Sequence, residues 1–150
     1  MNYPKKYIPT ILSLKDRKKQ KEELDASTKA YKEKRYLTRK KVKSFNSKES
    51  KHIKRAKKLY GVKTIKPSKL LSKKTKCSQS ALRAIVKKGR GAYYSSGSRP
   101  NQTAHSWAYA RLASAISGGP ASKVDYNILK KGCKKKSKAI FLAKKEKNKN

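Results

Sequence analysis

The stretch "GRGAYYSSGSRPNQTAHSWAYARLAS", residues 89–114, stands apart from the rest of a lysine-rich chain of 150 residues. It holds three of the seven glycines, three of the nine tyrosines and the only tryptophan. Such a composition is compatible with an active-site loop, with a phosphate-binding loop, or with the packed part of a small domain. The residues on either side of the stretch are needed to choose among these three interpretations.

Helix signals flank the stretch on both sides. Ser78 precedes the apolar pattern of "QSALRAIVKK", and Gly89 follows it in the position of a C-cap, which predicts one helix. A second helix is expected over about 102–117, with Asn101 or Thr103 as its N-cap and "GGP" as its stop. Between the two helices the glycines and tyrosines are expected to form a loop, in which glycine permits positive φ.

A last helix is expected after Ser122, which forms the pattern of a capping box with Asp125, and Gly132 supplies its stop. Every element between residues 78 and 132 thus carries its own start and stop signals, which favours a real folded unit. The side chains expected to form its core are Leu82, Ile85, Val86, Tyr93, Tyr94, Trp107, Leu112, Ile116, Ile128 and Leu129.

The fold class that these patterns predict is mainly α, with three to five short helices in a domain over residues 52–133. Residues 1–51 are expected to be a basic arm: prolines disfavour helix in the first twelve residues, and a charged helix over about 14–35 and a linker follow. Residues 134–150 are expected to be a basic tail, in which the apolar plug at 139–143 would dock on a partner. We find no internal repeat and no convincing strand pattern.

The charge of the chain is extreme and uneven. Lysine and arginine number 44 against 8 aspartate and glutamate, a formal net charge of +36, and no acidic residue occurs from Lys51 to Val124. Repulsion at this density favours a polyanion or an acidic protein surface as the partner. Of the basic residues 36 are lysine. Because arginine is the residue that reads guanine edges in pairs of hydrogen bonds, this bias favours charge neutralisation over sequence reading.

Catalytic groups are scarce. Asp125 is the only acid between residues 51 and 133, and it is already assigned to a helix cap. His105 lies beside Ser106, but members of a catalytic dyad meet in space and not as neighbours in sequence. We therefore expect a protein that is not an enzyme, with no cofactor and no small-molecule substrate.

The two cysteines, Cys77 and Cys133, lack the spacing of a metal-ligand set with each other or with the histidines. They flank the least charged part of the chain. Buried free thiols are expected here in preference to a disulfide, unless the protein resides in an oxidising compartment.

An anion site is the one binding hypothesis that the opening stretch supports. Its glycines, small hydroxyls and arginines precede a helix N-terminus, which attracts anions. The stretch is not a P-loop, because no GK[ST] follows. The alternative, a purely structural loop, stays open. The candidate anion contacts are Lys87, Lys88, Arg90, Ser95, Ser96, Arg99 and Arg111.

Membrane insertion is not expected. No apolar run approaches 18 residues, and the N-terminus lacks the apolar region of a signal peptide. The sequence therefore predicts a protein that is soluble and made in the cytoplasm, or one that lies on a surface without spanning a membrane.

The runs "KKGRGAYYSSGSRPNQTAHSWAYARLASAISGGPASKVDYNIL" (87–129) and "KSFNSKESKHIKRAKKLYGVKTIKPSKLLSKKTKCS" (43–78) resemble a small basic domain of unknown function from large DNA viruses of algae and amoebae and from some phages. The resemblance covers about two-thirds of the chain and implies no catalytic residue. It implies a viral protein, for which virion structure and genome binding are the expected roles.

The expectation that we favour at this stage is a minor capsid protein inside the virion, made in the host cytoplasm. Its lysines would face acidic surfaces of other capsid proteins, the inner membrane or the genome. The alternative is a protein that binds or condenses virion DNA.

Overall fold

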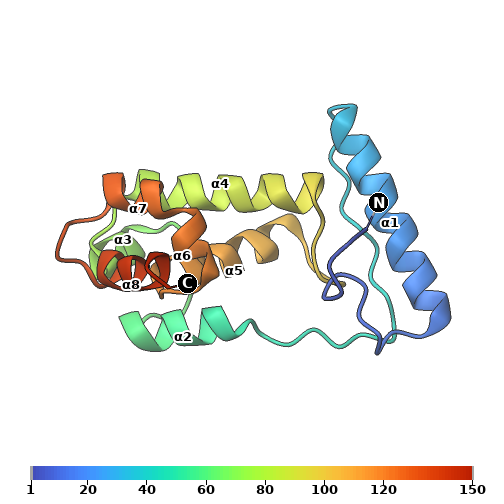
Figure 1. Ribbon diagram of the computed structural model, residues 1–150, viewed down its shortest axis with the longest axis horizontal. Helices are drawn as coiled ribbons and strands as arrows, with labels where there is room; N and C mark the ends of the chain where they lie inside the picture. Colours follow the sequence, from blue (N-terminus) through green and yellow to red (C-terminus); the bar gives the residue numbers. More distant parts are fainter. Residues whose placement is uncertain (1, 150) are drawn as a thin grey trace. The chain divides into compact units, whose positions relative to one another are not determined.

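The computed structural model describes residues 2–149. The chain is mainly helical, as the sequence predicted, with eight helices and no strand in the described residues (Figure 1). The chain divides into two compact units. The first unit holds the residues up to Lys48 together with Arg90–Trp107, and the second holds Glu49–Gly89 together with the residues from Ala108 onward. The predicted boundaries at residues 52 and 133 therefore coincide with only one of the divisions, near residue 50.

The first unit contains α1 (Leu14–Lys32), which Ser13 caps by accepting a hydrogen bond from the backbone N–H of Asp16. The segment before α1 is not a free arm, because it packs against that helix. Tyr3 Oη donates to Asp25 Oδ1 (2.7 Å), and Gln20 Nε2 donates to the backbone carbonyl of Tyr7 (3.1 Å). The arm predicted for the N-terminus is thus part of a folded unit.

Trp107 and Tyr94, which the sequence placed in the core, are half-buried in this unit. The ring of Trp107 meets the ring of Tyr7 edge to face, with centroids 5.9 Å apart, and Tyr94 contacts Tyr93 in the same manner. Tyr93 itself is fully buried. The aromatic residues of the opening stretch therefore fasten the N-terminal segment to the rest of the first unit.

The second unit is a helical bundle around one apolar core. It contains α2 (Lys51–Tyr60), α3 (Lys69–Thr75), α6 (Pro120–Val124), α7 (Tyr126–Gly132) and α8 (Lys138–Lys147). Helix α8 packs against α6 and α7, and α2 packs against α3. Of the side chains predicted for the core, Leu82, Ile85, Val86, Leu112, Ile116 and Leu129 are buried here, and Ile128 is half-buried against them.

Helix α8 replaces the basic tail that the sequence led us to expect. Ser137 caps it by accepting from the backbone N–H of Ile140, and Ala139, Ile140 and Ala143 belong to the hydrophobic core of the unit. The apolar plug therefore docks on the protein's own helices. No helix of residues 2–149 has the length and apolar character that a membrane crossing requires.

Helices α4 (Gln79–Ser95) and α5 (Ala104–Ile116) each contribute to both units. Helix α4 does not end at Gly89 as predicted, but continues through Gly89 and Gly91 to Ser95. A Cβ atom on Gly89 would lie 2.7 Å from Cα of Ala108 in α5. The glycine therefore permits close approach of two helices, which is a different use from the C-cap that the sequence suggested. The N-cap of α5 is Thr103, one of the two residues predicted for this role, and Thr103 Oγ1 accepts from the N–H of Ser106.

Candidate anion-binding surface

The residues predicted to contact an anion do not form a glycine-rich cradle. Arg90 and Ser95 lie on α4, while Ser96 and Arg99 lie in the short connection after it. Residues 89–95 of the predicted loop are helical, so their backbone N–H groups bond within α4 and do not surround an anion. Gly97 lies in the connection with a positive φ, and its N–H donates to the carbonyl of Ala92. Lys87 and Lys88 are exposed on the part of α4 that belongs to the second unit. Lys87 presents a single surface charge, whereas Lys88 Nζ lies within ion-pair distance of the carboxylate of Asp125.

Arg111 is not available to a ligand in the same way, because it is paired inside the second unit. Its Nε and Nη2 atoms donate to the two carboxylate oxygens of Asp125 at 2.9 and 2.8 Å. The side chain of Asp125 is fully buried, and Lys88 Nζ lies 3.7 Å from its Oδ1. The hydrogen bonds to Asp125 raise the pKa of Arg111. Asp125 is thus the anchor of an ion pair and not the helix cap that the sequence predicted, since no hydrogen bond caps α7 through its side chain.

A second arginine, which the sequence analysis did not identify, lies at the centre of the first unit. Arg39 is only 8% exposed, and its guanidinium donates to Ser27 Oγ, to the carbonyl of Tyr93 and to Ser98 Oγ, each at 2.8 Å. The guanidinium also lies 3.7 Å above the Tyr93 ring. Burial lowers the pKa of Arg39.

The partners of Arg39 given above are neutral, so it holds a positive charge inside the unit through hydrogen bonds and ring contact. Its only sequence signal is an arginine among the lysines of residues 38–43. Its bonds to Ser27 and Tyr93 join helices α1 and α4, so we assign it a structural role. The Arg39 guanidinium also donates to Ser98 Oγ, so this hydroxyl group of the stretch 89–114 already has a hydrogen-bond partner.

Two adjoining hollows of the surface lie in the second unit and share Lys136 and Lys138. Their volumes are about 330 and 270 Å³. Leu59, Tyr60 and Thr75 line the first hollow, and Ile140 and Phe141 line the second. We call the two hollows together the lysine groove, after the lysines that line it: Lys74, Lys76, Lys135, Lys136, Lys138 and Lys144.

The lysine groove carries one sign of charge only. All six lysines are exposed, and no carboxylate belongs to the residues that line the two hollows. Burial raises the pKa of Tyr60 well above its ordinary value, so its phenol, which donates to the carbonyl of Ile116, stays neutral. A concave surface of this kind focuses positive potential and attracts anions.

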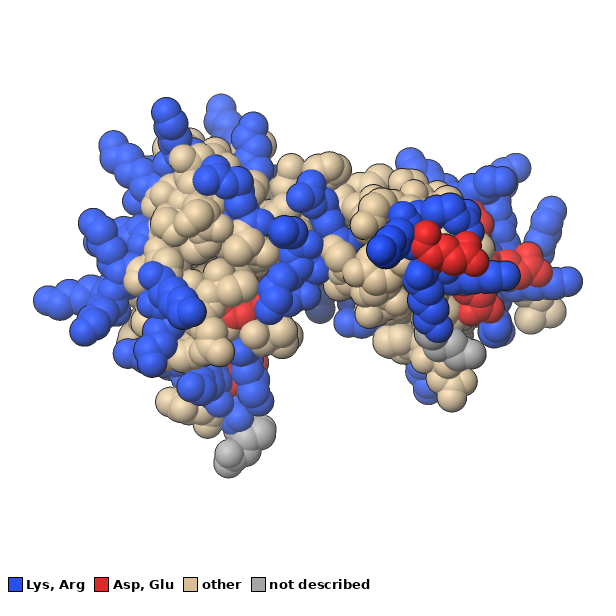
Figure 2. Space-filling model, turned by 90° about the horizontal axis from the view of Figure 1, so that it is seen from above, with Lys and Arg blue, Asp and Glu red and all other residues tan. Residues whose placement is uncertain are grey.

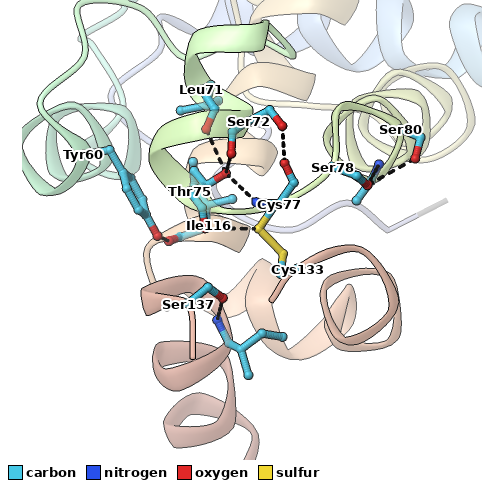
Figure 3. Close-up of a disulfide and its surroundings, with 12 residues drawn as sticks. Tyr60, Leu71, Ser72, Thr75, Cys77, Ser78, Ser80, Ile116, Cys133 and Ser137 are labelled. Carbon is cyan, nitrogen blue, oxygen red and sulfur yellow. Dashed lines mark hydrogen bonds between the residues drawn. A yellow bond between two sulfur atoms is a disulfide. The ribbon is translucent and has the colours of Figure 1, made fainter. Parts of the chain in front are cut away.

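A disulfide between Cys77 and Cys133 lies beside the groove (Figure 3). The expectation of free thiols was therefore wrong: the two cysteines are 56 residues apart in sequence, yet their Cα atoms are 3.8 Å apart. They face each other in an antiparallel bridge between the segments that follow α3 and α7. Two backbone hydrogen bonds flank the crosslink, from Ser78 N to Gly132 O (2.7 Å) and from Lys134 N to Lys76 O (2.9 Å).

The neighbourhood of the disulfide is ordered by small polar side chains. Thr75 Oγ1 accepts from the N–H of Cys77, and Ser72 Oγ donates to the carbonyl of Cys77 (Figure 3). Both sulfur-bearing residues are buried. The crosslink thus fixes the backbone of the two segments that carry the neighbouring groove lysines, Lys76 before Cys77 and Lys135 and Lys136 after Cys133.

The whole second unit repeats this imbalance of charge. It carries 26 lysines and arginines against three acidic residues. Each acid is already paired within the unit: Glu49 with Lys57, Asp125 with Arg111, and Glu146 with Lys149. Figure 2 shows basic side chains spread over the face drawn, with the acidic ones gathered mainly in one part of it. In the described residues, no group of three histidine, cysteine, aspartate or glutamate side chains is placed to hold a metal ion.

Fold and surface together define a small helical, lysine-rich protein that one disulfide crosslinks. The chain belongs to DUF5824, a family of unknown function whose sequence profile matches residues 4–127. Comparison with curated proteins and comparison with solved structures each found no match.

Proposed function

We propose that the protein binds nucleic acid without catalysis, by neutralising the phosphate backbone with lysines. The observation that carries the proposal is the charge of the second unit, where 26 basic residues accompany three acids that are all paired internally. Lysines without acidic partners are surrounded by mobile anions in solution. A phosphate backbone that replaces those anions gains binding free energy from their release and from the release of its own condensed cations.

The predominance of lysine sets the expected mode of binding. Lysine contacts a phosphate as a point charge, whereas arginine supplies the fork that recognises a base edge. We therefore expect affinity that depends strongly on salt and only weakly on base sequence. The absence of enzymatic activity belongs to the same proposal and follows from the scarcity of acids and bases already noted.

The test is the affinity for a fluorescent 20-base-pair duplex, measured by anisotropy between 50 and 200 mM NaCl. With about six phosphate contacts, log Kd should change with log salt with a slope of roughly 5, and duplexes of different sequence should bind alike. Failure to bind at 50 mM NaCl, or an affinity that does not change with salt, would overturn the proposal.

A second candidate is a structural role in a virus particle, as the resemblance implies. Exposed apolar side chains favour it: Ile11 and Leu14 are 75% and 79% exposed and lie on either side of the start of α1. Such residues suit contact with another protein, such as an acidic capsid component, or with the inner membrane. The protein should then remain with the shell when purified particles are stripped of DNA, and its loss with the DNA would exclude this role.

A further inference from the structure

We propose that the lysine groove is the principal phosphate site of the protein, and that the Cys77–Cys133 crosslink assembles it. The ligand is a run of adjacent phosphates on a nucleic-acid backbone. This inference rests on the proposed function and goes further, since it names the site and the covalent bond on which the site depends.

The first argument concerns the origin of the lysines. Lys74 and Lys76 end α3 and precede Cys77, whereas Lys135 and Lys136 follow Cys133. Like charges from two distant segments repel each other when they are brought together. The disulfide and the hydrogen bond from Lys134 N to Lys76 O hold the two segments side by side against this repulsion. The crosslink therefore creates a density of charge that neither segment has alone.

The second argument concerns α8, which begins at the groove. Lys138 is the first residue of α8 and lines both hollows. The buried Ser137 is the N-cap of this helix. The N-terminal end of a helix carries partial positive charge, which adds to that of the lysines around it. Helix α8 is fixed by its buried face, so the first turn presents Lys138 from a rigid support.

The third argument concerns the shape of the groove. Two adjoining open hollows with shared walls fit an extended row of anionic groups better than a single compact ion. Flexible lysine side chains on the rim can follow successive phosphates, and the neutral floor of Leu59 and Tyr60 offers nothing that repels them. Successive phosphates along one strand can therefore contact lysines of both hollows.

The test compares two variants that lose the same charge. The groove variant is K76Q/K136Q/K138Q, and the control is K15Q/K18Q/K29Q, which removes three exposed lysines of α1. Both variants weaken long-range attraction equally. If the groove holds phosphates, its variant should reduce the salt slope for the duplex by about 3, and the control should reduce it by less than 1.

Equal losses of slope and affinity in the two variants would overturn the inference, even though the wild type still binds DNA. A wild type that does not bind DNA would instead overturn the proposed function, so the two failures are distinguishable. Far-UV circular dichroism at the assay temperature verifies that both variants fold.

The crosslink is tested by reduction. Reduced wild-type protein should lose affinity and salt slope toward the level of the groove variant, while the groove variant itself should respond little to the reductant. If reduced wild type that is still folded by circular dichroism binds as tightly as the oxidised protein, the crosslink does not assemble the site.

A second measurement does not depend on any variant. In oxidised wild-type protein, acetylation of Lys76, Lys136 and Lys138 should slow at least tenfold when the duplex is bound, while that of Lys15 and Lys18 changes less than twofold. Uniform protection of all five lysines would overturn the inference. Inorganic tripolyphosphate serves as a further probe: if it protects the groove and DNA does not, the site takes a compact polyphosphate and the inference is wrong.

Discussion

Gly89 lies in the interior of α4, at the point where that helix meets Ala108 of α5. Its substitution by alanine should destabilise the protein by about 1–3 kcal/mol, because a Cβ atom there would meet backbone that cannot move aside. Gly91, two residues further along the same helix, has no atom within 4 Å of the corresponding position. There alanine should stabilise the protein by about 0.5–1 kcal/mol through its higher helix propensity. Chemical denaturation of both variants measures the difference, and effects of equal sign would contradict the packing described.

Arg111 and Asp125 form a pair in which the carboxylate is fully buried. Replacing Arg111 by methionine keeps much of the side-chain volume but leaves the carboxylate with only Lys88, 3.7 Å away. Loss of one partner of a buried pair typically costs about 3–5 kcal/mol, since the remaining charge stays desolvated. We expect a loss of this order in the free energy of unfolding.

The matched control for this pair is R83M, which removes an exposed arginine from α4. It should change the free energy of unfolding by less than about 0.5 kcal/mol. If R111M were as stable as R83M, Asp125 would be solvated and its pairing with Arg111 would not matter to the fold.

At the scale of the element, the stability of α8 shows whether the C-terminal segment belongs to the fold or docks on a partner protein. Ile140 is buried in the core and Phe141, the next residue, is 61% exposed. I140A should cost about 2–5 kcal/mol, while F141A should be close to neutral in the isolated protein. Thermal denaturation of the two variants is sufficient. Neutral results for both would mean that α8 docks only on a partner, as the sequence alone suggested.

The helix starts were predictable because each depends on a local pattern. Ser13, Ser50 and Thr103 all cap the helices that follow them, and Gly61 ends α2 in the left-handed conformation. These signals involve neighbours within four residues, so no tertiary information is needed to recognise them.

The predictions that were wrong involve residues whose role depends on contacts with residues distant in sequence. Gly89 has the local signature of a helix stop, yet its neighbour in space is Ala108 on another helix. The segment 139–143 is apolar throughout, but nothing in the sequence shows that the surface covering it is formed by α6 and α7 of the same chain. Asp125 fits a capping box in sequence, but in the structure both of its carboxylate oxygens accept from Arg111 and neither caps α7.

The candidate site was the least predictable feature. Charge composition indicated an anionic partner, but it did not indicate where on the folded chain lysines would gather around a hollow. The groove unites lysines on either side of Cys77 with lysines after Cys133, and nothing in the sequence shows that these segments touch. The predicted site around residues 87–99 drew on three glycines, of which Gly89 and Gly91 lie inside α4 and only Gly97 adopts a positive φ in the connection after it.

At the scale of the whole molecule, a net charge of +36 opposes every contact that makes the chain compact. Two features counter it in the second unit: a continuous core that reaches from α2 to α8, and a crosslink that closes 56 residues of chain. A disulfide over such a loop stabilises a protein by about 2–4 kcal/mol, mainly by restricting the unfolded chain. Both features oppose the repulsion, and a bound polyanion would stabilise the fold further.

This balance predicts the direction in which salt changes stability. In a protein with equal numbers of acids and bases, salt screens attractive pairs and weakens them, whereas here 44 basic residues meet only 8 acids and repulsion dominates. The thermal midpoint should therefore rise, by about 5 °C or more, between 10 and 500 mM NaCl, as the screening length falls from roughly 30 Å to below 8 Å. Scanning calorimetry on the oxidised protein measures it, and a midpoint that is constant or falls would show that internal ion pairs outweigh the repulsion. Sodium sulfate at equal ionic strength separates two causes: an equal rise indicates screening alone, and a larger rise is expected if anions also bind to a site such as the lysine groove.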